Sequence, residues 1–547
     1  MSTSEGRTVT TRGTPPRFVL LDQSLTGFVG HHYAYARLLV AAAREAGFRP
    51  VLAANRRLGD LGPDFPEVEV HRPFRHTTYC RHTYDADHRP RISTRLVRAL
   101  RVRSFAAGCA ELFRAVPLKE GDVVFAATMS ELDFAGLSLW LAAEPASLRA
   151  SWHVQFHLNL FRGREDDYSS QEPLAAKVRG VLASALAPLG THRLRLRCTT
   201  EALVRQYARL GVATVQALAY PIDEAFVPRV DATGEARPLR VAFLGHDRRE
   251  KGTSHLQQLV DELWDPYLRT GRVQLVVQAR PGKRHLVLPA DASPGIEPVV
   301  FAPVGLSRDR YVELVRNTDV GLLLYDAERY YTRCSGVLLE MLCAGVSVLV
   351  PAANWLADQI AEPIQIHLDA LLAAHGPERS IASGASFGAA PQRLQLDLTP
   401  PGRDLIVSCT WSTPLAPGVF VAMEARQLDA AGAKVATASH ILGPRAGGHP
   451  IRALVRVADG ARSLELSLRN AFGTTRVALS GVTTVSIPKG QPAGAVGLIA
   501  ADLADAPAMV REMIEGREHY RRTAGEFSTS CRARHSSSTV AASLLTD

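Results

Sequence analysis

The sequence has few cysteines, no long apolar run and no apolar leader segment. Its seven cysteines include no Cys-x-x-Cys pair, which argues against a disulfide framework or a structural zinc site and suits a reducing cytoplasm. No stretch approaches about 18 uncharged apolar residues, so a transmembrane helix is not expected. Residues 1–16 lack the apolar core of a signal peptide; we expect this segment to be disordered and do not expect secretion by that route.

Aromatic residues are also scarce, at 7%, and they do not interleave with the basic runs. No RNA- or DNA-reading motif occurs, so nucleic acid is not an expected partner. A length of 547 residues, 46% of them hydrophobic and 21% charged, is typical of a globular chain of two or three domains. The net charge of +9 favours anionic partners such as nucleotide phosphates or an acidic membrane face.

Two stretches follow the same order of strand, glycine-containing loop, helix and strand. The first covers residues 17–57, and the second covers residues 238–264 with a further strand at 273–279. This order is the opening βαβ unit of a parallel, doubly wound sheet. We therefore predict two Rossmann-like domains, residues 17–222 and 239–384, joined by a linker rich in proline, acidic and small residues at 223–238.

The pattern changes at about residue 385. Apolar and polar residues then alternate up to residue 488, and turn sequences such as DAAGA and GPRAGGHP recur. Alternation with a period of two and frequent turns predict an antiparallel β-sandwich over 385–488, inserted in the second domain. A helical pattern returns in 489–547, which we expect to complete that domain and to supply closing helices.

Ligands of such sheets bind at the carboxyl ends of the strands, and we expect two facing sheets to form a cleft there. Gly27 and Gly30, in TGFVGHHYAY, would let backbone approach a ligand before a helix N-terminus. An ordinary strand–helix turn explains the same residues.

The loop FLGHDRREKG places cations after a strand. Gly245 ends the strand, and Arg248, Arg249 and Lys251 follow before the next helix. Cations in this position could neutralise a diphosphate leaving group, with Lys251 as the preferred ligand. A solvated loop is the plainer alternative.

The segment CSGVLLEMLCAGVSVLVP carries one acid in an apolar helix. Ser335 and Gly336 open the helix, where backbone N–H groups could bind an anion, and Glu340 lies one turn further along. A carboxylate with apolar neighbours needs hydrogen-bond donors, and a ribose diol supplies two. A surface acid in a salt bridge is the alternative.

These two motifs resemble the donor-binding domain of GT-B glycosyltransferases of family four, the group 1 type. The resemblance covers most of the chain outside 385–488. It implies that Glu340 binds ribose hydroxyls and that Lys251, with Arg248 or Arg249, binds the diphosphate. It also implies retention of the anomeric configuration and no obligatory metal. The sequence departs from the motif at Thr332, where a sugar-binding glutamate is expected, and at His246, where an arginine is common.

Catalytic candidates come from four histidines and one acid. His31 and His32 lie in the first glycine loop, His153 and His157 lie on one face of an apolar strand, and Glu131 follows another apolar strand. Any of them could act as a general base or contact the sugar, although histidines on a strand are more often packing residues.

The pattern of residues 91–105 predicts a basic helix, with apolar residues between the arginines Arg91, Arg95, Arg98 and Arg101. Such a helix could contact an anionic membrane surface, although a solvated basic helix is commoner.

The prediction from sequence is thus a cytoplasmic retaining glycosyltransferase that moves a hexose-type sugar from a nucleoside diphosphate to a saccharide or lipid-linked acceptor, with peripheral contact to the inner membrane face as a further hypothesis. The inserted sandwich, which resembles carbohydrate-binding modules, would either grip a glycan or brace the cleft. The sandwich has few aromatic residues, Trp411, Phe420 and Phe472, which argues against glycan binding. A GT-B nucleotide-sugar epimerase and a non-catalytic glycan-binding scaffold are the alternatives.

Overall fold

A computed structural model describes most of the chain. The described residues are 15–28, 30–60, 64–79, 95–229, 237–245, 248–280, 282, 286–376, 378–398 and 402–546. Arg91, His246 and most of the predicted lead-in therefore lie outside them. The chain divides into two compact units, one made of Met1–Leu160, Pro173–Asp223 and His535–Asp547, the other of Phe161–Glu172 and Glu224–Arg534.

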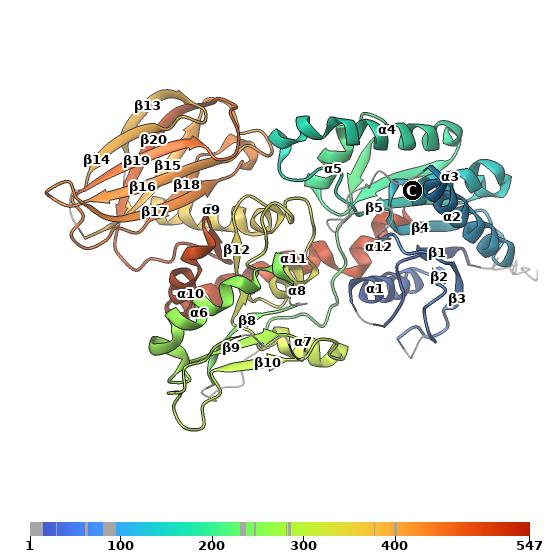
Figure 1. The fold of residues 1–547 in the computed structure, drawn as a ribbon, viewed down its shortest axis with the longest axis horizontal. Coiled ribbons are helices and arrows are strands. Elements are labelled where there is room, and N and C mark those ends of the chain that lie inside the picture. The colour runs from blue at the N-terminus through green and yellow to red at the C-terminus, as the bar shows by residue number, and fades with distance from the viewer. Residues whose placement is uncertain are drawn as a thin grey trace, which may run out of the picture. The chain divides into compact units, whose positions relative to one another are not determined.

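The first unit contains a seven-stranded parallel sheet in the order β3-β2-β1-β4-β5-β6-β7 (Figure 1). Its strands are β1 Arg17–Asp22, β2 Arg49–Asn55, β3 Glu69–Phe74, β4 Val123–Met129, β5 Ser151–Phe156, β6 Arg193–Cys198 and β7 Val215–Ala217. Its helices are α1 His31–Glu45, α2 Arg95–Ala115, α3 Glu131–Ala143, α4 Glu172–Leu186, α5 Glu201–Ala208 and α12 Ser537–Leu545.

The central strands of this sheet are buried, whereas β3 and β6 carry charged residues and are partly exposed. β1 and β4 are buried along their whole length, as expected for a parallel sheet between helical layers. The last helix of the chain, α12, packs against α1 and joins its core through Val540 and Leu544.

The second unit contains a six-stranded parallel sheet in the order β10-β9-β8-β11-β12-β21. Its strands are β8 Leu239–Phe243, β9 Val273–Gln278, β10 Val299–Ala302, β11 Val320–Leu322, β12 Ser347–Pro351 and β21 Gly497–Ala500. Its helices are α6 Leu256–Leu263, α7 Arg308–Arg316, α8 Gly336–Cys343, α9 Trp355–His375, α10 Ala506–Glu515 and α11 Arg517–His535.

An antiparallel sandwich interrupts this second sheet. Its two four-stranded sheets have the orders β13-β20-β15-β18 and β14-β19-β16-β17. The strands are β13 Arg379–Phe387, β14 Gln392–Asp397, β15 Asp404–Trp411, β16 Val421–Leu428, β17 Lys434–Leu442, β18 Ile451–Val455, β19 Ser463–Asn470 and β20 Val477–Ile487. One core of aliphatic side chains lies between the sheets, and α9 covers β18 and β20 from outside (Figure 1).

The topology shows where the sandwich is inserted. β12 precedes it, and β21, the first strand after it, returns to pair in parallel with β12. The predicted fold class, two Rossmann-like sheets with an antiparallel sandwich inserted in the C-terminal one, is therefore confirmed.

Candidate functional site

Lys251 stands at the carboxyl end of β8, on a loop that only glycines can form. Gly245 has φ +98° and Gly252 has φ +87°, values that L side chains rarely adopt. A Cβ on Gly252 would collide with the backbone oxygen of Leu324, just beyond β11, and a Cβ on Gly245 would collide with Nζ of Lys251. The two glycines thus let the lysine fold back against its own strand end.

The Lys251 ammonium is largely withdrawn from water. Burial lowers its pKa; Tyr330 is the largest opposing influence, and Glu340 also raises the pKa. The ammonium lies 5.1 Å from the ring centroid of Tyr325, whose face attracts cations. Among the residues that the structure describes, none forms an ion pair with Lys251. A buried cation in this state attracts an anionic ligand.

Helix α8 brings Glu340 into electrostatic range of this lysine. Ser335 caps the helix, because its hydroxyl accepts a hydrogen bond of 3.3 Å from the N–H of Leu338, and Gly336 is the first helical residue. Glu340 is half-buried, and its Oε2 accepts a hydrogen bond of 2.7 Å from the hydroxyl of Tyr311 on α7. Tyr311 supplies a donor that sequence reasoning missed.

The other predicted donor residues differ in exposure. Thr332 is 1% exposed, in the loop before α8. Arg248 is exposed and lies 3.6 Å from a carboxylate oxygen of Glu250. The side chain of Arg249 is outside the described atoms.

A second group of polar side chains gathers in the first unit. A small pocket of about 10 Å³ lies at the carboxyl ends of β1, β4 and β5, beside the start of α1. It is lined by Asp22, His31, His32, Tyr35, Ala127, Thr128, Gln155, His157 and Tyr220. This is the edge where a doubly wound sheet binds ligands.

Asp22 and the pocket histidines form a connected set. Nδ1 of His32 is 2.9 Å from Oδ2 of Asp22, an arrangement that fixes the orientation of the ring. Nε2 of His32 is buried and has no hydrogen-bond partner among the described residues. The rings of His31 and His157 stack in parallel, 5.9 Å apart. An oriented imidazole with an unused nitrogen beside a pocket can contact a substrate hydroxyl.

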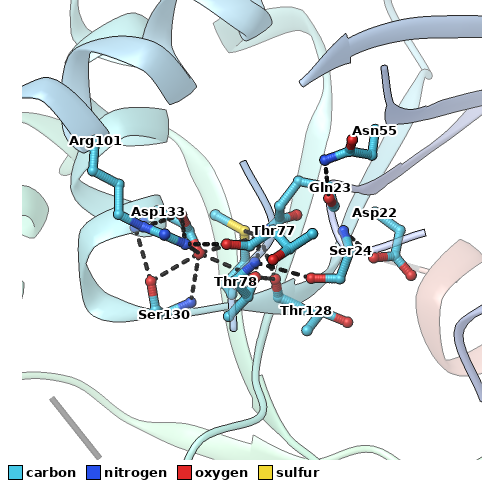
Figure 2. Close-up of polar contacts among 11 residues, drawn as sticks. Asp22, Gln23, Ser24, Asn55, Thr77, Thr78, Arg101, Thr128, Ser130 and Asp133 are labelled. Carbon is cyan, nitrogen blue, oxygen red and sulfur yellow. Dashed lines mark hydrogen bonds and ion pairs between the residues drawn. The ribbon is translucent and has the colours of Figure 1, made fainter. Parts of the chain in front are cut away.

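A buried polar network holds the end of β1 that carries Asp22 (Figure 2). The side-chain amide of Gln23 donates hydrogen bonds of 2.6 Å to Oγ1 of Thr78 and 3.2 Å to Oδ2 of Asp133. Arg101, from α2, donates to both carboxylate oxygens of Asp133 at 2.9–3.2 Å. The strand end that supports the pocket is therefore tied to two helices.

The remaining candidates lie apart from the pocket lining. His153 is buried within β5, and Glu131 is buried as the first residue of α3. Gly27 is half-buried and Gly30, with φ +90°, is exposed immediately before α1. The structure thus brings together His31, His32 and His157 of the predicted residues, and it adds Asp22, for which an acid at a strand's carboxyl end was an available signal.

No group of three or more His, Cys, Asp or Glu side chains among the described residues is placed to hold a metal ion. In the same residues, no helix combines the length and apolarity required to cross a bilayer.

No family model and no curated protein sequence matches the chain. Among solved structures, the chain is similar to an apo structure of OtsA, at 11% identity over 63% of this chain and 87% of that one, with a TM-score of 0.44. It is also similar to WaaG, a glycosyltransferase involved in lipopolysaccharide biosynthesis, at 12% identity over 64% and 84% of the chains, with a TM-score of 0.39. A third is a trehalose-6-phosphate structure from E. coli bound with UDP-2-fluoro glucose, at 11% identity over 62% and 86%, with a TM-score of 0.40.

All three TM-scores are below 0.5, so these neighbours add nothing to the fold class that the sheet topology itself shows. At such identities and scores the likeness concerns the fold alone, so the argument about activity rests on the residues.

Proposed function

We propose that the protein is a glycosyltransferase that moves a hexose-type sugar from a nucleoside diphosphate to a saccharide or lipid-linked acceptor. The observation that carries the proposal is Lys251, a largely buried ammonium in a glycine-built loop with no ion-pair partner among the described residues. A nucleotide sugar supplies the missing anion, and its departure as a diphosphate builds up the charge that this lysine stabilises.

Glu340 completes the proposed donor site. Its carboxylate keeps acceptor capacity beyond its bond with Tyr311, because an ionised carboxylate offers about four lone-pair sites. A ribose diol bound there would place the diphosphate toward Lys251, whose pKa the charge of Glu340 already influences. The acid would thereby select a nucleotide over inorganic diphosphate.

The acceptor is proposed to bind at the histidine pocket of the first unit. His32, oriented by Asp22, would hold the attacking hydroxyl through its buried Nε2. In the retaining course that the sequence resemblance implies, the hydroxyl attacks the face from which the diphosphate leaves, and a diphosphate oxygen takes the proton. His32 then orients the nucleophile and does not need to remove its proton.

The test is a titration of nucleoside diphosphates by calorimetry, followed by a panel of nucleotide sugars assayed for hydrolysis and transfer. Lys251→Met and Glu340→Ala should each weaken nucleotide binding at least tenfold while the chain stays folded. Lys489→Met, at an exposed ion pair with Asp459, is the matched control and should bind normally. Unaltered binding in both site variants would reject the assignment.

The same assay separates the alternatives. Release of nucleoside diphosphate only when an acceptor is present indicates transfer, whereas a changed sugar without release indicates an epimerase. Absence of nucleotide binding by the wild type indicates a non-catalytic scaffold, an alternative that rests on the threonine at position 332.

Contact with an anionic membrane remains a proposal of its own, for a cytoplasmic protein working at the inner membrane face. On α2, Leu96 is 68% exposed and Leu100 is 56% exposed, and Arg95 and Arg103 are exposed beside them. Apolar and cationic side chains together suit an interfacial helix. Vesicles containing phosphatidylserine should co-float with the wild type but not with Leu96→Ser/Leu100→Ser; equal binding to neutral vesicles would reject the proposal.

A further inference from the structure

A short segment of the N-terminal half belongs structurally to the second unit. Residues 161–172, which we call the strap, lie between β5 and α4 in sequence but group with the six-stranded sheet and the sandwich of the second unit. Phe161 and Tyr168 stack at 4.3 Å and are both 1% exposed, so the strap has a small core of its own. The N–H of Arg164 donates to Oδ2 of Asp167 at 3.1 Å and starts a 3₁₀ helix, Glu165–Gln171.

One side of the strap contacts the inserted sandwich. The guanidinium of Arg164 lies 3.6 Å from the ring centroid of Phe472, in the turn after β19. Arg164 is 7% exposed, and burial lowers its pKa even though nearby acids oppose the shift. Gly418, before β16, has φ +88°, and a Cβ there would collide with the carboxylate of Glu165. The Arg164 guanidinium is thus buried against a ring that itself stays 39% exposed, within the range at which a ring face attracts a cation.

The other side contacts the loop between β11 and α8, residues 323–335, which we call the donor loop. The hydroxyl of Tyr331 donates a hydrogen bond to Oε2 of Glu165. Nε of Arg162 lies 3.6 Å from Oε2 of Glu328. Tyr331 is 3% exposed, and it immediately precedes Thr332, the position where the resembling family carries its sugar-binding glutamate.

The far end of the donor loop is tied to the loop between Gly245 and Gly252 that carries Lys251, which we call the phosphate loop. The N–H of Asp326 donates to the backbone oxygen of Glu250 at 2.9 Å. The rings of Tyr325 and Tyr330 are 4.4 Å apart, and the Lys251 ammonium lies over the first of them. The donor loop therefore has two anchors: the phosphate loop at one end, and the strap at the end that leads to Thr332.

We infer that the inserted sandwich is a brace for the donor loop, and that Glu165 is a positioning residue through which the brace acts on the bound sugar. The sandwich holds the strap through Phe472 and Gly418, and the strap holds Tyr331. These contacts would hold the sugar end of the donor loop in place by packing, where a glutamate at position 332 would hold the sugar by direct contact. The inference rests on the proposed function, since it concerns the sugar that the donor site would hold.

The test compares nucleotide binding with turnover in Tyr331→Phe, Glu165→Gln and Arg164→Met. Each variant loosens the sugar end of the donor loop but leaves the contacts of Lys251 in place. Affinity for the nucleoside diphosphate alone should stay within twofold of wild type, while kcat with the nucleotide sugar falls about tenfold. Tyr331→Phe removes this hydrogen bond and Glu165→Gln weakens it by removing the charge of the acceptor, so the double variant should be no slower than Tyr331→Phe alone.

Controls lie on the outer face of the same sandwich. Glu465 lies on β19 between Arg393 and Arg426, at 3.7 Å and 3.9 Å, and pairs with these arginines of the sandwich itself. Glu465→Gln should leave kcat unchanged if the sandwich is a brace. A glycan-gripping sandwich predicts the opposite pattern, with transfer to an oligosaccharide lowered by Glu465→Gln and insensitive to the strap variants.

The outcomes are distinct. Unchanged kcat in all three strap variants, or nucleoside diphosphate affinity falling in parallel with kcat, would overturn the brace. If Tyr331→Phe fails to fold, Glu165→Gln decides alone, because it keeps the size of the side chain and removes only the charge that strengthens the bond to Tyr331. Failure of the wild type to bind any nucleoside diphosphate would instead overturn the proposed function.

Discussion

The buried ion pair between Arg101 and Asp133 permits a prediction with a worked magnitude. Their side chains are 4% and 3% exposed, and the guanidinium also donates to the backbone oxygen of Thr77 at 2.8 Å. Arg101→Met removes the cation and leaves a buried carboxylate whose remaining hydrogen-bond donors in the described part of the chain are neutral groups of Ser130, Thr78 and Gln23. Removing one partner of a buried pair typically costs about 3–5 kcal/mol, because the other charge stays buried.

Asp133→Asn should lower the free energy of unfolding by a similar amount, because it leaves the Arg101 cation buried without its partner. It also weakens the capping box at the start of α3. The two losses should not add, because both single changes break the same contact. Arg103→Met is the matched control, since this exposed arginine on the same helix should contribute within about 0.5 kcal/mol.

Hydrogen exchange of β4 in urea provides the assay, because it reports the first unit by itself in a chain whose several domains need not unfold together. Arg101→Met should reduce the protection of this strand far more than the control. Equal protection in the two variants would refute the reasoning that this pair fixes the strand ends around the histidine pocket.

Three further predictions follow from single positions. Gly252→Ala should reduce nucleotide affinity more than tenfold by forcing the phosphate loop off the backbone beyond β11, whereas Gly282→Ala, at φ +82° with open space, should bind normally. His32→Gln should lower transfer at least tenfold yet leave nucleoside diphosphate binding unchanged; a product of inverted configuration from the wild type would make His32 a base and reject the retaining course. Burial lowers the pKa of His440 from 6.5 to about 4. The unfolded chain therefore binds a proton at a higher pH than the folded sandwich does, and the stability of the sandwich decreases as the pH is lowered from about 6.5 to 4. The loss should reach at most about 2 kcal/mol by pH 5, since the residue is only half-buried, and urea titrations at pH 7 and 5 should show it abolished in His440→Phe but not in His449→Gln.

Much of the fold was predictable because its signals are local. Apolar strands that alternate with helical segments specify a parallel sheet, and the change to a period of two at residue 385 marks the sandwich. The sequence placed Gly245 at the end of a strand and Lys251 in the loop after it, whereas the φ values of +98° at Gly245 and +87° at Gly252 were seen only in the structure.

Contacts between distant segments could not be read in this way. The spacing of the arginines in residues 91–105 predicted a basic surface helix that includes Arg101. Tertiary packing instead buries Arg101 against Asp133. Tyr311 carries no motif, and only the packing of α7 on α8 delivers its hydroxyl to Glu340.

By itself, then, the sequence determined which segments form strands and helices. It also located a cationic loop after a strand and a single acid in an apolar helix, because these features depend on neighbours a few residues apart. The tertiary structure alone decided that the strap joins the second unit, that the His32 ring contacts Asp22 at the end of β1, and that Lys251 is partly withdrawn from water. Those outcomes depend on burial and on pairing across tens to hundreds of residues, for which no local pattern exists.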